Sequence, residues 1–393
     1  MRDSSDEQNL IDSDWISNVL NHAIRKHASD IHIDPHQQGS VIRVRIDGML
    51  HQIGSFDTNL HASSVSQIKI LSNLDIVNVF IPQDGQFEHQ IGDQRHYVRV
   101  STFPTIYGEA VVMRILNHSK SSVSIHDLGL YEQQVADLYS IIFNPFGMVL
   151  ATGPTGSGKS TLLNSILTEL NTEQNNIITV ENPVEFRIDG VRQTQIDPIH
   201  NFGFAEALRA ILRQDPDIMM IGEIRDSETA QVAVQAALAG RLLFSTFHTF
   251  DLLGIVARLI EMNIPRSVIG HILNGVISVR LVRKICNNCR EPHELTDHEK
   301  FVFRKYAIAD IQFYHGHGCD KCSNTGYDGT VGIYEVVPFD TDLRTAVLDN
   351  VTSADFHKII KSKKILTLFD GALIKARDGV TTTAEVIRVI GAK

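Results

Sequence analysis

The first part of the chain mixes helical and strand-like patterns of apolar residues. Residues 14–27 carry apolar side chains at helical spacing, which predicts an amphipathic helix with one buried face. In the later run VIRVRIDG, apolar and polar positions alternate, so its apolar side chains would share one strand face while Arg43 and Arg45 point the other way as surface charge. The pair Asp47-Gly48 predicts a turn into a further strand.

Two more strand-like runs, residues 97–102 and 110–116, complete this part of the pattern. Together these elements predict a compact α+β domain over residues 1–117. The polar sequence NHSKSS follows, and we expect a linker at residues 118–125.

The rest of the chain repeats a different pattern, in which a short apolar strand is followed by a Gly-rich turn and a helix. GMVLATG precedes KSTLLNSILTEL, DIMMIGE precedes DSETAQVAVQAALAG, and the apolar run RLLFSTFHT comes next. This order predicts a mainly parallel, helix-covered sheet. We therefore expect residues 126–393 to form one α/β domain, with a cysteine-containing insert at 286–322 and helices at its end.

Composition narrows the class of protein. The chain has 393 residues, of which 43% are hydrophobic and 21% charged, as in globular proteins of two or three domains. It contains no run of ~20 apolar residues and its first residues lack the order of a signal peptide, so we expect a cytoplasmic protein. Its net charge of −10 argues against broad binding of nucleic acid or anionic lipid.

One loop has the pattern of a phosphate-binding site. GPTGSGKST matches G-x-x-x-x-G-K-[ST] between a predicted strand and a predicted helix, which is the context that this motif requires. Lys159 would neutralise the β- and γ-phosphates of ATP, and the Ser160 hydroxyl would bind Mg²⁺. The alternative is an ordinary glycine turn. The candidate nucleotide-binding residues are Gly153, Pro154, Thr155, Gly156, Ser157, Gly158, Lys159, Ser160 and Thr161.

A second chemical element lies on a later strand. The run DIMMIGE delivers Glu223 at the carboxyl end of a buried strand, the edge where α/β sheets bind ligands. Beside a phosphate loop, such a carboxylate would support Mg²⁺ or the attacking water. The alternative is an exposed carboxylate at the end of a strand.

The four cysteines form two pairs of the same spacing. Cys286 and Cys289 make one pair, Cys319 and Cys322 make the other, and 29 residues separate the pairs. Four thiolates complete a closed tetrahedral shell, so this set predicts a structural Zn²⁺ site rather than a catalytic one. Redox or unliganded thiols are the alternative.

Several motifs in the same order resemble the type II secretion and type IV pilus ATPases across nearly the whole chain. They are ASDIHIDP and RIDG in the first domain, the loop GPTGSGKST, the acidic segment VENPVE, LRQDPDIMMIGEIRD around Glu223, and the histidine segment STFHT. The resemblance implies a PAS-like first domain and a RecA-like P-loop ATPase domain with a four-cysteine zinc-binding insert. It also implies a homo-hexamer.

The same resemblance suggests roles for individual residues. Glu223 would orient or activate the attacking water, and Glu181 and Glu185 would support Mg²⁺ or the water network. His248 would sense the γ-phosphate or couple it to domain movement. Glu185 could instead be a plain turn carboxylate, and His248 a buried core histidine.

Two arginines of the first domain resemble a pair that reaches the nucleotide phosphates. Arg99 and Arg114 lie in RVSTFPTIYGEAVVMR, which resembles the family segment that carries these arginines. ATP would then close the first domain onto the second through both side chains, because guanidinium groups stay protonated. The alternative is that both arginines lie on a solvated strand face.

The resemblance has two departures. The acidic segment reads Glu181-Asn182 where the family usually has Glu-Asp, and the histidine segment opens Gly240-Arg241 where the family usually has Gly-His. They motivate an alternative function, a scaffold that binds ATP but hydrolyses it weakly. A small-molecule P-loop kinase fits the long first domain and the cysteine insert poorly.

The expected function is a hexameric ATPase that powers assembly of a type IV pilus or a type II secretion pseudopilus, or a competence-type pseudopilus for DNA uptake. Within this family the four-cysteine insert favours assembly over retraction. The expected partner is an inner-membrane platform protein that holds the chain peripherally at the membrane, with no direct contact to nucleic acid. The chain starts close to its first strands, without the N-terminal docking domain of many relatives, so we expect a short member or a truncated chain.

Overall fold

The computed structural model describes residues 14–92, 94–116, 123–197, 200–249, 251–304, 306 and 311–391. The chain divides into two compact units, Met1–Lys120 and Ser121–Lys393, which are described separately below. Most of the predicted linker at 118–125 lies outside the described residues. Among those residues, no helix is both long and apolar enough to cross a membrane.

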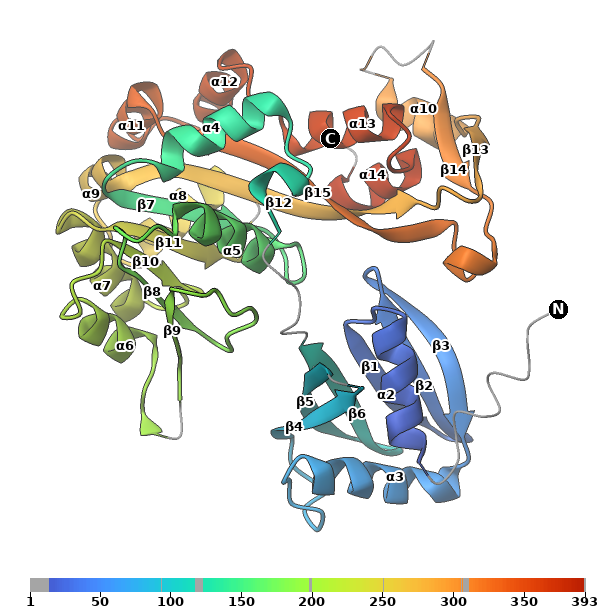
Figure 1. The fold of residues 1–393 in the computed structure, drawn as a ribbon. Helices are drawn as coiled ribbons and strands as arrows, with labels where there is room; N and C mark the ends of the chain where they lie inside the picture. Colours follow the sequence, from blue (N-terminus) through green and yellow to red (C-terminus); the bar gives the residue numbers. More distant parts are fainter. Residues whose placement is uncertain are drawn as a thin grey trace. The chain divides into compact units, whose positions relative to one another are not determined.

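The first unit is an antiparallel sheet with two helices on one face (Figure 1). Its strand order is β3-β2-β1-β6-β5-β4. The strands are β1 (Asp30–His36), β2 (Gly39–Ile46), β3 (Met49–Phe56), β4 (Gln83–Ile91), β5 (Gln94–Thr105) and β6 (Gly108–Leu116), and the helices are α2 (Trp15–Arg25) and α3 (Thr58–Leu71). Apolar residues of both helices and of alternate strand positions form one core, as the alternation in the sequence predicted.

Local turn chemistry sets the register of this sheet. Asp47 and Gly48 both have positive φ and join β2 to β3, which is the predicted two-residue turn. Arg43 and Arg45 lie on the face that the helices leave open, as expected. Both are ion-paired, however: Arg43 lies 2.8 Å from Asp34, and Arg45 lies 3.8 Å from Asp30.

The second unit is built on a seven-stranded sheet of order β15-β12-β7-β11-β10-β8-β9. All its neighbouring pairs are parallel except β12 with β15, so the predicted mainly parallel sheet is confirmed. The strands are β7 (Gly147–Thr152), β8 (Ile177–Glu181), β9 (Arg192–Gln195), β10 (Ile218–Ile221), β11 (Leu242–Phe247), β12 (Leu273–Ile285) and β15 (Tyr327–Pro338).

Helices cover both faces of this sheet, and a hydrophobic core fills each side. One face packs against α4 (Glu132–Ile142), α5 (Lys159–Leu170) and the short 3₁₀ helix Ile125–Asp127. The other packs against α6 (Phe204–Ile211), α7 (Ser227–Leu238), α8 (Leu252–Glu261), α9 (Arg266–Ile272), α11 (Thr341–Leu348) and α12 (Ser353–Ser362). Strands buried on both faces read as continuous apolar runs, which is why the sequence revealed them.

A smaller lobe is built around the far ends of the long strands β12 and β15 (Figure 1). It contains β13 (Arg290–His293), α10 (Asp297–Phe303), β14 (Phe313–Gly316), the 3₁₀ helix Asp320–Cys322, α13 (Leu368–Arg377) and α14 (Thr383–Ile390). The sequence predicted the cysteine insert and the final helices here, but not the two long strands.

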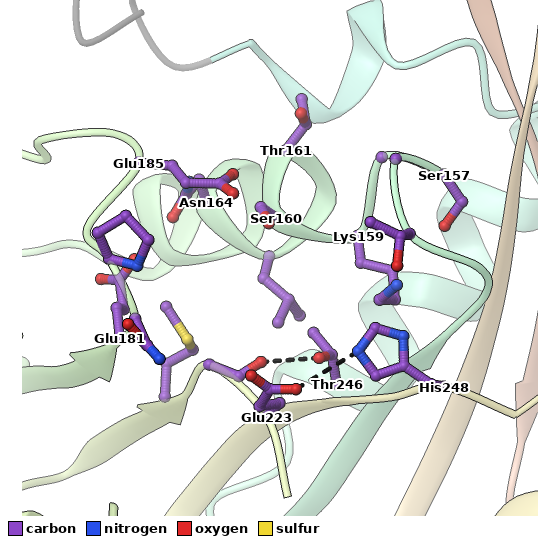
Figure 2. Close-up of a pocket in the computed structure, with 18 of the residues that line it drawn as sticks. Ser157, Lys159, Ser160, Thr161, Asn164, Glu181, Glu185, Glu223, Thr246 and His248 are labelled. Carbon is purple, nitrogen blue, oxygen red and sulfur yellow. Dashed lines mark hydrogen bonds and ion pairs between the residues drawn. The ribbon is translucent and has the colours of Figure 1, made fainter. Parts of the chain in front are cut away.

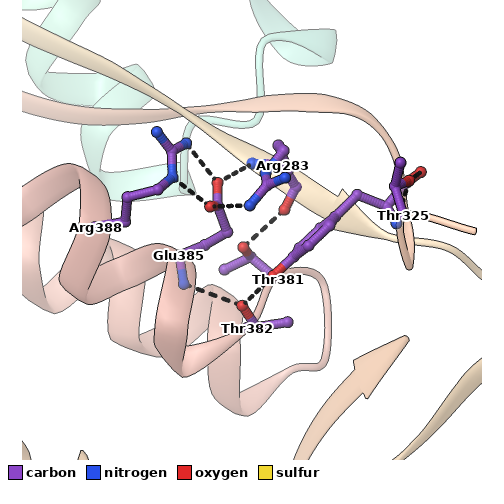
Figure 3. Close-up of polar contacts among 7 residues, drawn as sticks. Arg283, Thr325, Thr381, Thr382, Glu385 and Arg388 are labelled. Atoms are coloured by element: carbon purple, nitrogen blue, oxygen red, sulfur yellow. Dashed lines mark hydrogen bonds and ion pairs between the residues drawn. The ribbon is translucent and has the colours of Figure 1, made fainter. Parts of the chain in front are cut away.

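A buried carboxylate on α14 links this helix to β12 by hydrogen bonds (Figure 3). Glu385 of α14 accepts hydrogen bonds from the backbone N–H of Arg283 at 3.0 Å and from the guanidinium of Arg283 at 2.7 Å. Arg388 donates two more, at 2.5 and 2.8 Å. The Arg283 guanidinium also lies 3.9 Å from the centre of the Tyr327 ring. Burial opposes ionisation of Glu385, but the bonds from Arg388 and Arg283 outweigh it and lower its pKa to about 2.

Candidate functional site

The predicted phosphate loop joins β7 to α5. The buried strand ends at Thr152, and the helix begins at Lys159 after Gly158, whose φ is +94°. Gly153 has to be glycine, because a Cβ there would lie 2.5 Å from both the Ser157 hydroxyl and the carbonyl of Val279. The loop therefore leads directly into the amino end of α5, whose free N–H groups and positive dipole end suit a phosphate group.

Lys159 lies inside the loop and is held by it. Its Nζ donates hydrogen bonds to the carbonyls of Gly153 at 2.7 Å and Pro154 at 2.9 Å. Burial, together with the nearby charge of Arg280, lowers the pKa of Lys159 to about 8. A bound phosphate would supply the anionic partner that these neutral carbonyls replace.

Glu223 follows β10 and lies across the pocket from the loop (Figure 2). Its side chain is only 13% exposed, and Oε1 lies 2.6 Å from Nη2 of Arg225. Oε2 lies 3.4 Å from Nε2 of His248 but accepts no hydrogen bond from any described residue. A buried carboxylate oxygen with unused acceptor capacity can accept a hydrogen bond from a water molecule.

Glu181 and Glu185 lie at the other side of the same pocket (Figure 2). Glu181 is the last residue of β8 and accepts hydrogen bonds from Thr179 at 2.6 Å and Gln193 at 3.1 Å. Burial raises the pKa of Glu181. Glu185 lines the pocket from the segment after Pro183.

The structure thus gathers most of the predicted nucleotide-binding and catalytic residues of the second unit into one pocket of about 420 Å³, which Gly153 and Pro154 do not line. Residues 155–161 of the loop line it together with Glu181, Glu185, Glu223 and His248. The lining side chains that the sequence did not predict include Asn164, Phe204, Arg225, Thr246 and Leu281. Arg225 was within reach of a sequence argument, because it follows Glu223 by two residues; Leu281 was not, because it comes from the unpredicted strand β12.

The two departures from the family pattern fall in different places. Asn182 lines the pocket, so the missing carboxylate is a change at the site itself. Arg241 directly precedes β11, at the end of that strand opposite His248, and lies 3.6 Å from Asp215. It does not line the pocket.

Arg99 and Arg114 belong to the first unit. They are direct partners in the antiparallel pairing of β5 with β6, and both side chains are about half exposed. Arg99 lies 3.9 Å from Asp84, and Nε of Arg114 donates a hydrogen bond to Asp30 at 2.9 Å.

The four cysteines come together in the smaller lobe, with all their sulfur atoms within 4.8 Å of one another. Three Sγ–Sγ distances are 3.7, 3.8 and 3.9 Å. A tetrahedral Zn²⁺ with Zn–S bonds of ~2.3 Å requires sulfur atoms ~3.8 Å apart, so the donor set fits zinc. Asn288 donates a hydrogen bond to Cys319 at 3.3 Å, which contributes most to lowering the pKa of that thiol to about 6 and favours the thiolate that a metal binds.

Structural comparison supports the fold. The X-ray structure of the ATPase DotB from Legionella pneumophila superposes with a TM-score of 0.69 at 21% identity, covering 95% of this chain and 94% of that one. The crystal structure of the pilus retraction motor PilT with bound ADP gives a TM-score of 0.60 at 23% identity, covering 95% of this chain and 96% of that one. At such identities the likeness concerns the fold alone.

Comparison of the sequence with known proteins identifies the family. The type II secretion system ATPase E of Vibrio cholerae is 42% identical over 374 residues, which is 95% of this chain and 74% of that protein. The type II secretion system protein E of Dickeya dadantii is 43% identical, with the same coverage. The type IV pilus assembly ATPase PilB of Thermus thermophilus is 39% identical over 95% of this chain and 42% of its own length. A family described as "Type II/IV secretion system protein" matches residues 4–388. The chain therefore belongs to the type II/IV secretion system protein family.

Proposed function

We propose that this chain is an ATPase that powers assembly of a type IV pilus or of a type II secretion pseudopilus. The observation that carries the proposal is the single pocket in which Lys159 and Ser160 face the buried carboxylate of Glu223. The named relatives are ATPases of both kinds of machine. This set of residues favours hydrolysis over a scaffold that only binds ATP, and Arg241 gives the scaffold no support because it lies outside the pocket.

Each side chain then has a role in phosphoryl transfer. The loop N–H groups and Lys159 hold the β- and γ-phosphates, and the Ser160 hydroxyl holds Mg²⁺, which neutralises charge on the phosphate oxygens. Glu181 and Glu185 support the metal or its water molecules. Glu223 orients the attacking water through its unsatisfied Oε2, and His248 connects this carboxylate to the segment after β11.

The first unit supplies the response to the γ-phosphate. In this proposal Arg99 and Arg114 contact the phosphates of ATP and lose that partner when phosphate leaves. Each round of ATP binding and hydrolysis would therefore bring the two units together and let them separate again. ATP shifts such an equilibrium only through contacts that ADP lacks. A homo-hexamer would pass this movement to a platform protein at the inner membrane, where the chain works from the cytoplasmic side.

Zinc has a structural part in the proposal. Cys286, Cys289, Cys319 and Cys322 would hold one Zn²⁺, which joins the start and the end of the insert. The closed set of four thiolates leaves no open position for chemistry.

The test separates binding from hydrolysis in the full chain. We expect the purified protein to release phosphate from ATP, Glu223→Gln to bind ATP normally while releasing phosphate at least ~100-fold more slowly, and Lys159→Ala to lose ATP affinity. Calorimetry measures the binding and a phosphate assay measures the turnover. Undiminished ATP binding by Lys159→Ala, or parent turnover by Glu223→Gln, would refute the site.

A further inference from the structure

A lateral row of charged residues crosses the open face of the first unit. Arg45 of β2 pairs in register with Asp30 of β1, Asp30 pairs with Arg114 of β6, and Arg114 pairs with Arg99 of β5. Three guanidinium groups therefore share this row with one carboxylate. Neighbouring positions on adjacent strands lie about 5 Å apart, so side chains that are adjacent in this row are within reach of one another.

Asp30 is the buried member of the row. Its side chain is 8% exposed, whereas that of Arg114 is 53% exposed. Nε of Arg114 donates to Oδ1 at 2.9 Å, and the Ser29 hydroxyl donates to Oδ2 at 2.8 Å. Arg45 lies 3.8 Å from the same Oδ2. Both carboxylate oxygens are thus engaged, and the carboxylate is a fixed point in the sheet.

We propose that Asp30 is a positioning residue that aims Arg114 at the nucleotide phosphate. This inference rests on the proposed function, in which Arg114 contacts the γ-phosphate of ATP.

The geometry of the contact supports this role. Asp30 holds Arg114 by Nε, and within the part of the chain that the structure describes, the two terminal nitrogens of Arg114 donate no hydrogen bond. Those two nitrogens form the edge of the guanidinium that binds phosphate through two parallel bonds. The hydrogen bond at Nε therefore restricts the Arg114 side chain and leaves its two terminal nitrogens available for phosphate.

The energetic benefit is preorganisation. A free arginine side chain loses rotamer entropy when it binds a ligand. Asp30 fixes the side chain before ATP arrives, so less entropy remains to be lost in the closed state. The effect is confined to ATP, because ADP has no γ-phosphate for Arg114 to contact.

The same face offers a matched control. Asp34, on the same strand, accepts two bonds from Arg43 at 3.0 and 2.8 Å. Asp34→Asn removes a carboxylate–arginine pair from the same sheet face without touching Arg99 or Arg114. Any general effect of losing such a pair appears in this variant as well.

The experiment is a double-mutant cycle in the full chain. We compare Asp30→Asn, Arg114→Ala and the double variant with Asp34→Asn, measuring kcat/KM for ATP hydrolysis, ADP affinity and melting temperature. We expect Asp30→Asn to lower kcat/KM about tenfold with little change in ADP affinity, and to add nothing when Arg114 is already alanine. Asp30→Glu should restore part of the loss, and Asp34→Asn should match the parent.

Two failures are distinguishable. If Arg114→Ala hydrolyses ATP like the parent, the proposed contact of Arg114 with the phosphate is wrong. If Arg114→Ala is impaired but Asp30→Asn behaves like Asp34→Asn, then Asp30 does not act through Arg114. The same holds if Asp30→Asn lowers kcat/KM equally in the parent and in the Arg114→Ala variant. A fall in melting temperature with unchanged kcat/KM likewise reduces Asp30 to a structural role.

Discussion

Nε2 of His248 lies 3.4 Å from Oε2 of Glu223, just beyond the carboxyl ends of the neighbouring parallel strands β11 and β10. The carboxylate is largely buried, while half of the histidine side chain is exposed. His248 therefore contacts the buried carboxylate from a half-exposed position on the segment after β11. In the proposed mechanism this contact would couple Glu223, the group that orients the water, to the segment after β11.

Replacement of His248 tests this coupling. We expect His248→Ala to lower kcat roughly tenfold, which corresponds to a loss of ~1.4 kcal/mol of transition-state stabilisation, while ATP affinity stays near the parent value. His248→Gln, whose amide can donate a hydrogen bond to Glu223, should lose less. Equal turnover by the parent and both variants would show that His248 has no part in hydrolysis.

The metal site predicts one Zn²⁺ per chain. The chain has only four cysteines, so a thiol reagent reports on the whole site. We expect elemental analysis of protein purified without chelators to give one zinc per chain, and four thiols to become reactive when a chelator removes it. Protein that carries no stoichiometric zinc, or four thiols that react before chelation, would contradict the assignment.

Glu385 predicts an acid-sensitive contribution to stability. Its folded pKa of about 2 lies below the ordinary value of 4.5, so the contribution is complete above about pH 5 and is lost as the pH falls from 4.5 toward 2. A shift of this size corresponds to about 3 kcal/mol. We expect Glu385→Gln to lower the melting temperature at pH 7 and to reduce the difference in stability between pH 7 and pH 4.

A matched substitution on the surface controls for this measurement. Glu261 lies 2.9 Å from Arg258 with both side chains about half exposed or more. Exposed pairs of this kind contribute about 0–1 kcal/mol, so Glu261→Gln should melt close to the parent. Equal melting temperatures for the two glutamine variants would mean that the contacts of Glu385 do not stabilise the lobe.

The proposed contact of Arg99 and Arg114 with the phosphates predicts a loss of activity that is specific to ATP. Each charge-assisted bond is worth ~1.5–3 kcal/mol, so Arg99→Ala combined with Arg114→Ala should lower kcat/KM at least ~100-fold and leave ADP affinity nearly unchanged. Arg95→Ala is the control, because Arg95 lies on the same strand but is mostly exposed beside Glu88. A double variant that hydrolyses ATP at the parent rate in its native assembly would reduce both arginines to surface charge.

The sequence determined the features that depend on local chemistry. The glycines and Lys159 of the loop predicted a phosphate site because this spacing lets the backbone turn around a phosphate between a strand and a helix. Asp47-Gly48 identified a hairpin turn because both residues tolerate positive φ. The buried parallel strands were recognisable as apolar runs, because both of their faces are covered. The spacing of the two cysteine pairs indicated one metal site.

Tertiary structure alone decided which distant residues meet. Sequence patterns did not reveal β12, although Leu281 of this strand lines the candidate nucleotide pocket and Arg283 of the same strand binds Glu385. They could not separate Asn182, which lines the pocket, from Arg241, which does not. Arg45 was predicted to be plain surface charge, but the register of β1 and β2 placed it beside Asp30. Strand order and register join residues far apart in the chain, and hydrophobic periodicity carries no information about which strand is the neighbour.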